Sequence, residues 1–583
     1  MDKMGMNKQQ QEVRADKGVI SPHVLDAIII GSGFGGICQA IKLRKSGVHG
    51  FVILEKEKDL GGTWRDNTYP GAQCDIPSAL YSYSFEATQH YNSYLGQPAI
   101  LDYIRSVANK YKIAQHISYK KTVDRLKYDE FAHIWNVHTS EGQHYKARFV
   151  ISAVGQLHHP KIPKIAGCEK FNGDSIHTAQ FGLKKIENFV GKRVAVVGTG
   201  ASAIQLIPPL QKVCTKVNLY QRTPSYILPK IGFSKIEEHI IAKYPCIRNL
   251  ARDFLQQYAE ILFSAIRGKS WAQKFLKKTC CLNLESKVRS AEKRKTLMPD
   301  YPIGTKRTLL SDEFYPAVDQ SNVFIHSMGI KGIYDDGIIN SDDSLTEVDE
   351  IIYATGFITN SFLHGISVIG RSNKELWKDE QGAHAFWGVM TTGFPNMFFL
   401  YGPNTNTGHA SVIDFLEEQA EFVLRAMQHV KNNNHKSIEV KASVENKFNE
   451  RVQKVSKDLT FAKLENSNYM HNGRLINNWI GTVGEYKAGL ASIDFSEDFI
   501  IHGKDDSENY GVLLDMKRGS KPESLQTHTK AEFCAVASNA LMRIPVYSIM
   551  IASQIIRTAV RLTSDYQLKT PSVGSLHAKV ANC

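Results

Sequence analysis

Two glycine-rich turns carry the residues with the clearest chemistry in this sequence. Residues 26–36 read DAIIIGSGFGG, so Gly31, Gly33 and Gly36 follow an apolar run that is typical of a buried parallel strand. This GxGxxG spacing permits a tight turn, brings backbone amides close to a pyrophosphate and lets the next helix pack closely. The following run, FVILEK, ends at Glu55, whose carboxylate suits the two hydroxyls of a ribose.

A second turn repeats this pattern with the opposite charge. Residues 193–203 read RVAVVGTGASA, with Gly198 and Gly200 after another apolar strand and Ala203 in the third small position. Arg222 stands at the offset that the carboxylate has in the first turn, 24 residues after the first glycine. A guanidinium suits a 2′-phosphate by charge and by paired hydrogen bonds. We therefore expect FAD at the first turn and NADPH at the second, with a surface arginine as the alternative for Arg222.

The composition describes a globular protein of several domains. A chain of 583 residues exceeds the ~250 to 300 at which single cores stop growing, and 42% of it is hydrophobic. Residues 1–23 contain no apolar run and no cleavage site, so they are expected to be a mobile leader rather than a secretory signal. The nine cysteines are odd in number and show no CxxC spacing, which predicts reduced thiols in a cytoplasm and no metal site.

The charge is basic and unevenly distributed. The formal net charge of +13 would suit nucleic acid, membrane lipid or an anionic cofactor, and residues 267–307 hold twelve Lys/Arg against Glu285, Glu292 and Asp300. We interpret this segment mainly as a solvated helical face and expect no nucleic-acid partner.

Further motifs carry a family resemblance. GGTWRDNTYPGAQCD fits the pattern (A/G)GxW, four residues, (F/Y)P(G/M), three residues and Asp. The sequence resembles the class B flavoprotein monooxygenases, and most closely the Baeyer–Villiger monooxygenases, from about residue 24 to 482. The motifs are GGTWRDNTYPGAQCD at 61–75, FNGDSIHTAQF at 171–181, ATGF at 354–357, FPNMFFLYGPNTNTGH at 394–409 and NGRLINNWIG at 472–481.

The resemblance implies a set of site residues. Lys306 would join Arg222 and Thr223 at the 2′-phosphate, and Arg307 would enter the active site, where Asp75 would hold it. The FAD residues expected are Gly31, Gly33, Gly36, Glu55, Thr63, Trp64, Asp75, Tyr81 and Val412. The NADP residues expected are Gly198, Thr199, Gly200, Ser202, Ala203, Arg222, Thr223, Lys306 and Arg307.

The resemblance also implies the chemistry, with Arg307 and Asp75 as catalytic residues. Reduced flavin and O2 give a C4a-peroxyflavin, which attacks a ketone when anionic and suits amines or sulfides when protonated. A cation about 4 Å away is worth roughly 4 kcal/mol at an effective dielectric near 20, or about three pKa units. Arg307 would thus favour oxygen insertion next to a ketone carbonyl, giving an ester or lactone. A 2′-phosphate contact or a surface ion pair is the alternative for Arg307.

The segment FNGDSIHTAQF leaves the subfamily open. The resemblance implies an interdomain linker in which Gly173 provides a bend and His177 a hydrogen-bonded anchor. Phe181 replaces the tryptophan of the Baeyer–Villiger pattern, which favours the related flavin-containing monooxygenases that oxygenate nitrogen and sulfur. A second alternative is a redox-sensing or membrane-recruited protein whose flavin turns over slowly.

We expect an α/β fold of two Rossmann-like dinucleotide-binding domains with a helical insertion and a C-terminal extension. Asn404 and His409 are polar candidates at the flavin, with His409 more typical of a loop hydrogen-bonding residue than of a base. The expected boundaries are 24–160 and 346–482 for the two parts of the FAD domain, 165–345 for the NADP domain, 232–300 for the helical insertion and 490–583 for the extension.

The extension contains one apolar segment. Residues 544–556 read IPVYSIMIASQII, 13 residues against the ~20 that span a bilayer, and Arg543, Arg557 and Arg561 flank them. We expect a helix docked on the core, with a weak membrane-surface contact through 543–561 as the alternative. The corresponding localisation is cytoplasmic, or peripheral at a membrane.

Overall fold

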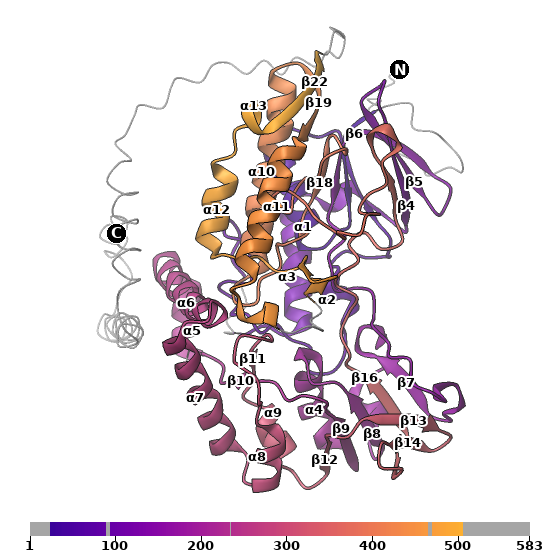
Figure 1. Ribbon diagram of the computed structural model, residues 1–583, viewed down its shortest axis with the longest axis vertical. Coiled ribbons are helices and arrows are strands. Elements are labelled where there is room, and N and C mark those ends of the chain that lie inside the picture. The colour runs from indigo at the N-terminus through magenta and orange to yellow at the C-terminus, as the bar shows by residue number, and fades with distance from the viewer. Residues whose placement is uncertain (1–23, 89–93, 183, 234, 464–468, 505–583) are drawn as a thin grey trace, which may run out of the picture.

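A computed structural model describes residues 24–88, 94–182, 184–233, 235–463 and 469–504. The expectations for the leader 1–23 and for 543–561 concern residues outside these ranges. The described chain forms two bodies, each built on its own sheet, with a layer of helices along one side (Figure 1). The predicted α/β class is confirmed.

The first body is built on an eight-stranded sheet. Its strands are β1 (Leu25–Ile30), β2 (Phe51–Glu55), β3 (Ile117–Tyr119), β4 (Val123–Asp129), β5 (Ile134–Thr139), β6 (His144–Ser152), β17 (Ser367–Ile369) and β18 (Met397–Phe399). Their order is β17-β4-β5-β6-β1-β2-β3, and β18 pairs with the end of β6. The apolar residues of β1 are buried in the middle of the parallel part, as their continuous run predicts.

Helices cover this sheet and complete the first body. They are α1 (Phe34–Lys45), α2 (Thr63–Asp66), α3 (Gln97–Lys110), α10 (Val412–Asn432), α11 (Ala442–Ser456), α12 (Val483–Ala491) and α13 (Phe495–Asp498). α1 packs against α10, so the helix after the first glycine turn touches a helix almost 400 residues later in the chain. Short strand pairs add β19 (His435–Val440) with β22 (Phe499–Lys504), and β20 (Met470–His471) with β21 (Arg474–Leu475).

The second body is built on a five-stranded parallel sheet. Its strands are β7 (Asp174–His177), β8 (Arg193–Val197), β9 (Lys216–Tyr220), β12 (Val323–His326) and β16 (Glu350–Tyr353), in the order β12-β9-β8-β16-β7. The helices α4 (Ala201–Val213) and α9 (Phe314–Val318) pack together in its core. An antiparallel ribbon of β13 (Ile330–Tyr334), β14 (Gly337–Asn340) and β15 (Leu345–Glu347) lies beside it.

The helical insertion leaves and rejoins the second body at one point. β10 (Ile227–Leu228) pairs with β11 (Leu309–Leu310), so the chain between them forms a closed excursion. Its helices are α5 (Lys235–Lys243), α6 (Pro245–Ile266), α7 (Ser270–Lys287) and α8 (Ala291–Leu297). They form the helical layer on the outer side of the molecule in Figure 1.

Two expected boundaries differ from the structure. β16 lies between β8 and β7, so residues 350–353 complete the second sheet and the chain returns to the first body after them, not after 345. The reason is that the apolar EIIY needs burial on both faces, which only the middle of a parallel sheet provides. β22 pairs with β19, so residues up to 504 also belong to the first body rather than to an extension from 490.

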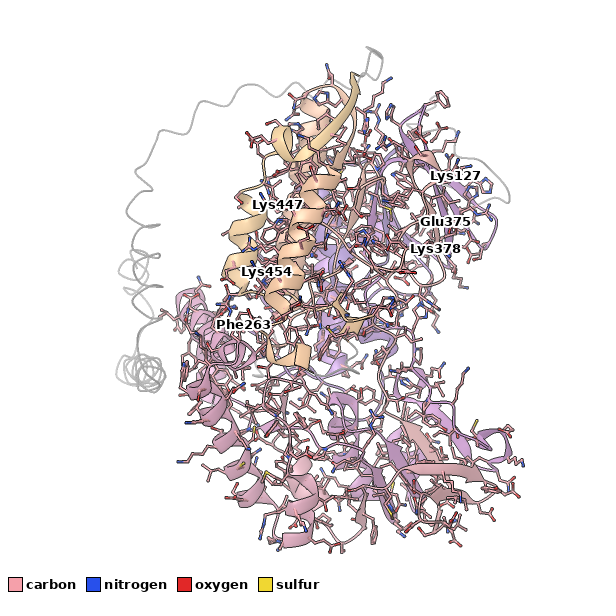
Figure 2. All side chains as sticks on the ribbon, in the orientation of Figure 1. Lys127, Phe263, Glu375, Lys378, Lys447 and Lys454 are labelled. Carbon is pink, nitrogen blue, oxygen red and sulfur yellow. The ribbon has the colours of Figure 1, made fainter. Side chains whose placement is uncertain are left out.

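The insertion is fastened to the first body along α6. Arg252 donates a 2.7 Å hydrogen bond to the Asp414 carboxylate at the start of α10. Phe263 stacks on His409 with ring centroids 4.5 Å apart, and Figure 2 labels Phe263 where the insertion meets the first body. The Thr460 hydroxyl donates to carbonyl oxygens at the end of α6. Among the described residues, no helix combines the length and apolarity that crossing a membrane requires.

The position of Glu260 on α6 predicts that the stability of the protein depends on pH. Burial between α6 and α12 raises the pKa of the Glu260 carboxyl from 4.5 to about 7, and the negative charge of Glu485 adds to the rise. The folded protein therefore keeps this proton where the unfolded chain has lost it, so this carboxyl costs stability progressively from pH 4.5 to 7 and fully above pH 7. The unfolding free energy of Glu260→Gln should equal that of the parent near pH 4.5 and should exceed it by on the order of 3 kcal/mol at pH 8.

Thermal unfolding of the two proteins across this pH range checks the prediction. The gap in Tm should open as pH rises, and a gap that is the same at pH 5 and pH 8 would contradict it.

Candidate active site

A single cavity of about 1630 Å³ receives residues from both bodies. Both glycine turns line it, as do the fingerprint loop after β2 and the loop that precedes β11. Of the residues predicted for the site, six do not line the cavity: Gly36, Ala203, Gly173, His177, Asn404 and His409.

The first glycine of each turn is held against a neighbouring strand. Gly31 has φ +100°, and a Cβ there would lie 2.6 Å from the Ala153 carbonyl oxygen. Gly198 has φ +119°, and its Cβ would lie 2.4 Å from the Ala354 carbonyl oxygen. Both positions therefore exclude side chains, and both open the start of a helix to the cavity.

The helix ends at these turns suit phosphate. α1 and α4 begin without an acidic residue in the first turn and without a side-chain cap. Their first backbone N–H groups and the positive end of the helix dipole are thus available to an anion. Gly36 and Ala203 lie one turn further in, where small size lets the helix pack; a Cβ at Gly36 would lie 1.9 Å from the Gly31 carbonyl oxygen.

Glu55 is fixed at the edge of the cavity, at the end of β2. Its carboxylate accepts hydrogen bonds from the Ser32 N–H at 2.9 Å and the Ser32 hydroxyl at 2.6 Å. Arg65 donates to its other oxygen at 3.1 Å. Ser32 and Arg65 were not predicted, although Ser32 lies inside the glycine turn and Arg65 inside the fingerprint. The carboxylate is therefore held where a ribose at the first turn would meet it.

The fingerprint loop joins the two bodies. Trp64 donates through Nε1 to the Tyr81 hydroxyl at 2.9 Å, and both residues line the cavity. The Tyr69 hydroxyl donates at 2.8 Å to Gln205 on α4, which belongs to the second body. Thr63, the first residue of α2, and Val412, the first residue of α10, also line the cavity.

Arg222, Thr223 and Lys306 gather beside the second glycine turn. Thr199 in the turn donates its hydroxyl to the Thr223 carbonyl at 3.0 Å. Burial lowers the pKa of the Lys306 ammonium, and the nearby positive charge of Arg222 lowers it further. Among the described residues the Arg222 guanidinium has no hydrogen-bond or ion-pair partner. Two cations placed this close without a shared carboxylate fit an anionic group such as a phosphate.

Arg307 and Asp75 form an ion pair across the cavity wall. Arg307 donates to the Asp75 carboxylate through Nη2 at 2.6 Å and through Nε at 3.2 Å. The charge of Asp75 is the main cause that raises the pKa of Arg307, so the guanidinium is positive at any ordinary pH. The Arg307 side chain remains 34% exposed and lines the cavity, which leaves part of the guanidinium free to meet a ligand.

Polar residues that were not predicted complete this region. Gln156 donates to the Tyr401 carbonyl at 2.9 Å, and Asn477 donates to the Gln156 side chain at 2.9 Å. Tyr401 and Tyr469 lie close enough to Arg307 that its charge opposes the rise that burial causes in the pKa of each phenol. Tyr401 and Asn477 fall inside two of the quoted motifs, but nothing in the motifs indicated which members face the cavity.

Asn404 and His409 do not reach the cavity. Asn404 donates to the carbonyls of Leu475 and Asn478 and is buried. Burial lowers the pKa of His409 to about 3, so its ring is neutral where it stacks on Phe263.

The linker residues also have structural positions. His177 ends β7 and accepts a hydrogen bond from the Ala179 N–H at 3.1 Å. Gly173 is small because of close packing rather than a bend, since its Cβ would lie 2.3 Å from the Asp349 carbonyl oxygen. Phe181 is 1% exposed and packs against Phe189 in the second body's core, so it does not reach the cavity.

Known proteins resemble this chain over most of its length. Residues 28–230 match the family described as pyridine nucleotide-disulphide oxidoreductases. A Baeyer–Villiger monooxygenase of Pseudomonas aeruginosa is 36% identical over 80% of this chain and 90% of its own. An FAD-binding monooxygenase of Aspergillus niger is 35% identical over 82% of this chain and 81% of its own.

A solved structure shares the fold. The oxidised form of a steroid monooxygenase bound to NADP superimposes with a TM-score of 0.74 at 25% identity, covering 82% of this chain and all of that one. The identity and coverage of these relatives, together with the two glycine turns that open onto one cavity, show that this chain belongs to the Baeyer–Villiger monooxygenases, within the class B flavoprotein monooxygenases.

Proposed function

We propose that this protein uses NADPH and O2 to insert one oxygen atom next to the carbonyl of a small-molecule ketone, giving an ester or lactone. The observation that carries the proposal is the Arg307–Asp75 ion pair in the wall of a cavity that both dinucleotide turns share. The two relatives and the solved structure that were compared are named as monooxygenases.

FAD fits the first turn. Gly31 and Gly33 with the start of α1 would hold its pyrophosphate, and Glu55 its ribose. The flavin ring would lie among Trp64, Tyr81, Thr63, Asp75 and Val412, which line the same cavity.

NADPH fits the second turn. Gly198, Thr199, Gly200 and Ser202 line the cavity at the start of α4 and would hold the pyrophosphate. Arg222, Thr223 and Lys306 would hold the 2′-phosphate, which NADH lacks. NADPH supplies the hydride, and reduced FAD with O2 supplies the oxygen atom that is transferred.

The residues of this chain would direct that oxygen to a carbonyl. Arg307 places a positive charge in the cavity, and Asp75 fixes two of its donor nitrogens so that the guanidinium points in one direction. Attack on a ketone develops negative charge on the carbonyl oxygen, which a fixed cation stabilises more than it stabilises the neutral ketone. The hydrogen bonds of Gln156 and Asn477 would hold the cavity wall at Tyr401, close to Arg307.

No observation on the described residues favours the alternative function, oxygenation of nitrogen or sulfur. The sequence signal for it was Phe181, and this residue is part of the core of the second body. Its identity therefore bears on packing and gives no reason to prefer an amine or a sulfide as the substrate.

Cofactor preference tests the second turn. In Arg222→Ala and in Lys306→Ala, the KM for NADPH should rise by about 10- to 100-fold, since each change removes a hydrogen bond between charged groups. The KM for NADH should change by less than about three-fold, because NADH has no group for these cations to bind. Steady-state oxidation of both nucleotides measures this, with Lys127→Ala on the exposed face of β4 as a control. An equal loss with both nucleotides would contradict the assignment.

The arginine is tested by its effect on the reaction rather than on binding. Arg307→Ala should lower kcat for ketone oxygenation by about 100- to 1,000-fold, the usual cost of removing a group that stabilises an oxyanion. The protein should remain yellow and folded, because the FAD turn lies elsewhere. Product analysis by mass spectrometry, with flavin absorbance as a control, measures both. Undiminished ester formation in this variant would refute the role of Arg307.

A further inference from the structure

The outer face of α7 combines lysines with exposed apolar side chains. We call Trp271, Lys274, Lys277, Lys278 and Leu282 the basic aromatic face. Their spacing places all five on one side of the helix. The opposite side of α7 is buried against α6, β10 and the core of the second body by Ala272, Leu276, Cys280 and Leu284. The basic aromatic face is exposed while the opposite side of α7 is buried, and α7 itself lies on the outer margin of the molecule in Figure 1.

The three lysines repel one another. Lys274 lies three and four residues before Lys277 and Lys278, spacings at which like charges on a helix destabilise it. All three are exposed, and among the described residues none has a hydrogen-bond or ion-pair partner. The basic residues at the two ends of α7 differ: Arg267 pairs with Glu485 and Lys287 with Asp312.

The apolar side chains of the basic aromatic face are exposed to water, which is unfavourable for apolar surface. Trp271 is 51% and Leu282 is 54% exposed, and they lie on either side of the lysines, about 16 Å apart along the helix. The one acidic residue on this side, Glu285, lies beyond Leu282 at the C-terminal end. The exposed apolar side chains are unfavourable in water, and a salt bridge to the neighbouring lysines would not cover them. A partner for this surface must therefore offer both negative charge and an apolar layer.

We propose that the basic aromatic face docks on an anionic lipid surface. Trp271 and Leu282 would enter the headgroup layer, where an amphipathic indole ring is well accommodated. The lysine stems would lie along the same apolar layer while their ammonium groups meet lipid phosphates. α7 would lie parallel to the lipid surface, so that all five residues of the basic aromatic face could contact it together. This inference does not depend on the substrate of the enzyme.

Two other occupants fit less well. A nucleic acid would satisfy the lysines through its phosphates but would leave Leu282 in water. The chain's own residues 505–583 hold more Lys/Arg than Asp/Glu, so they offer no net charge that complements this face. An anionic bilayer satisfies the charges and the apolar side chains together.

Another helix supplies a matched control. α11 exposes Lys447, Arg451 and Lys454 on one face, and Figure 2 labels Lys447 and Lys454 on the first body, away from α7. This face carries the same number of cations as the basic aromatic face but no exposed tryptophan or leucine. Reversing its three charges changes the net charge of the protein by the same amount.

Vesicle co-sedimentation of the full chain tests the proposal. The parent should bind vesicles of phosphatidylcholine with 30% phosphatidylglycerol, and should bind pure phosphatidylcholine at least about ten-fold less. Each lysine near an anionic surface is worth about five-fold in affinity, so Lys274→Glu, Lys277→Glu and Lys278→Glu together should weaken binding on the order of 100-fold or more. Trp271→Ser should weaken it by about five- to ten-fold with the lysines intact.

The outcomes separate the proposal from its rivals. The triple change Lys447→Glu, Arg451→Glu and Lys454→Glu should weaken vesicle binding by less than about three-fold. NADPH oxidation should be unchanged in every variant, which shows that the protein remains folded. Equal losses from the α7 and α11 triples would mean that net charge alone drives binding and would overturn the proposal. So would no binding by the parent, or tighter binding to a DNA duplex that Trp271→Ser leaves unaffected.

Discussion

The ion pair between Arg307 and Asp75 is the interaction on which the site depends. Asp75 comes from the fingerprint loop of the first body, and Arg307 from the loop that returns from the helical insertion to the second. The pair therefore joins two bodies whose glycine turns open onto the same cavity. A carboxylate that binds two donor nitrogens fixes both the charge and the direction of the guanidinium, which one hydrogen bond would not.

The helical insertion supports this pair from behind. The end of α6 lies against Gly304, three residues before Arg307, and Thr460 of the first body binds the last carbonyls of the same helix. Phe263 on α6 stacks on His409, which precedes α10 and the cavity wall at Val412. The insertion thus connects the arginine loop to the helix that borders the cavity at Val412, so a segment outside both sheets supports the site.

The sequence predicted what depends on local conformation. The strand, turn and helix at Gly31 and at Gly198 follow from apolar runs and from glycines at positions that exclude a side chain. Glu55 and Arg222 stand at the same distance after the two turns, so their opposite charges could be compared directly in the sequence. It did not predict what depends on distant packing. Asn404 and His409 are as polar as Tyr401 and Asn477, but contacts with α6 and with residues 475–478 turn them from the cavity. β16 likewise joins the second sheet through partners about 155 to 175 residues earlier.

The most direct test of the central claim is a competition within one reaction mixture. The protein is given NADPH, O2 and equal amounts of a cyclic ketone and an aryl sulfide, and the lactone and sulfoxide formed are quantified in the parent and in Asp75→Asn. If the carboxylate holds Arg307 for attack on carbonyls, the ratio of lactone to sulfoxide falls by ten-fold or more in the variant while flavin content is unchanged. An unaltered ratio would contradict the claim, because oxygen would then reach the carbonyl without a positioned guanidinium.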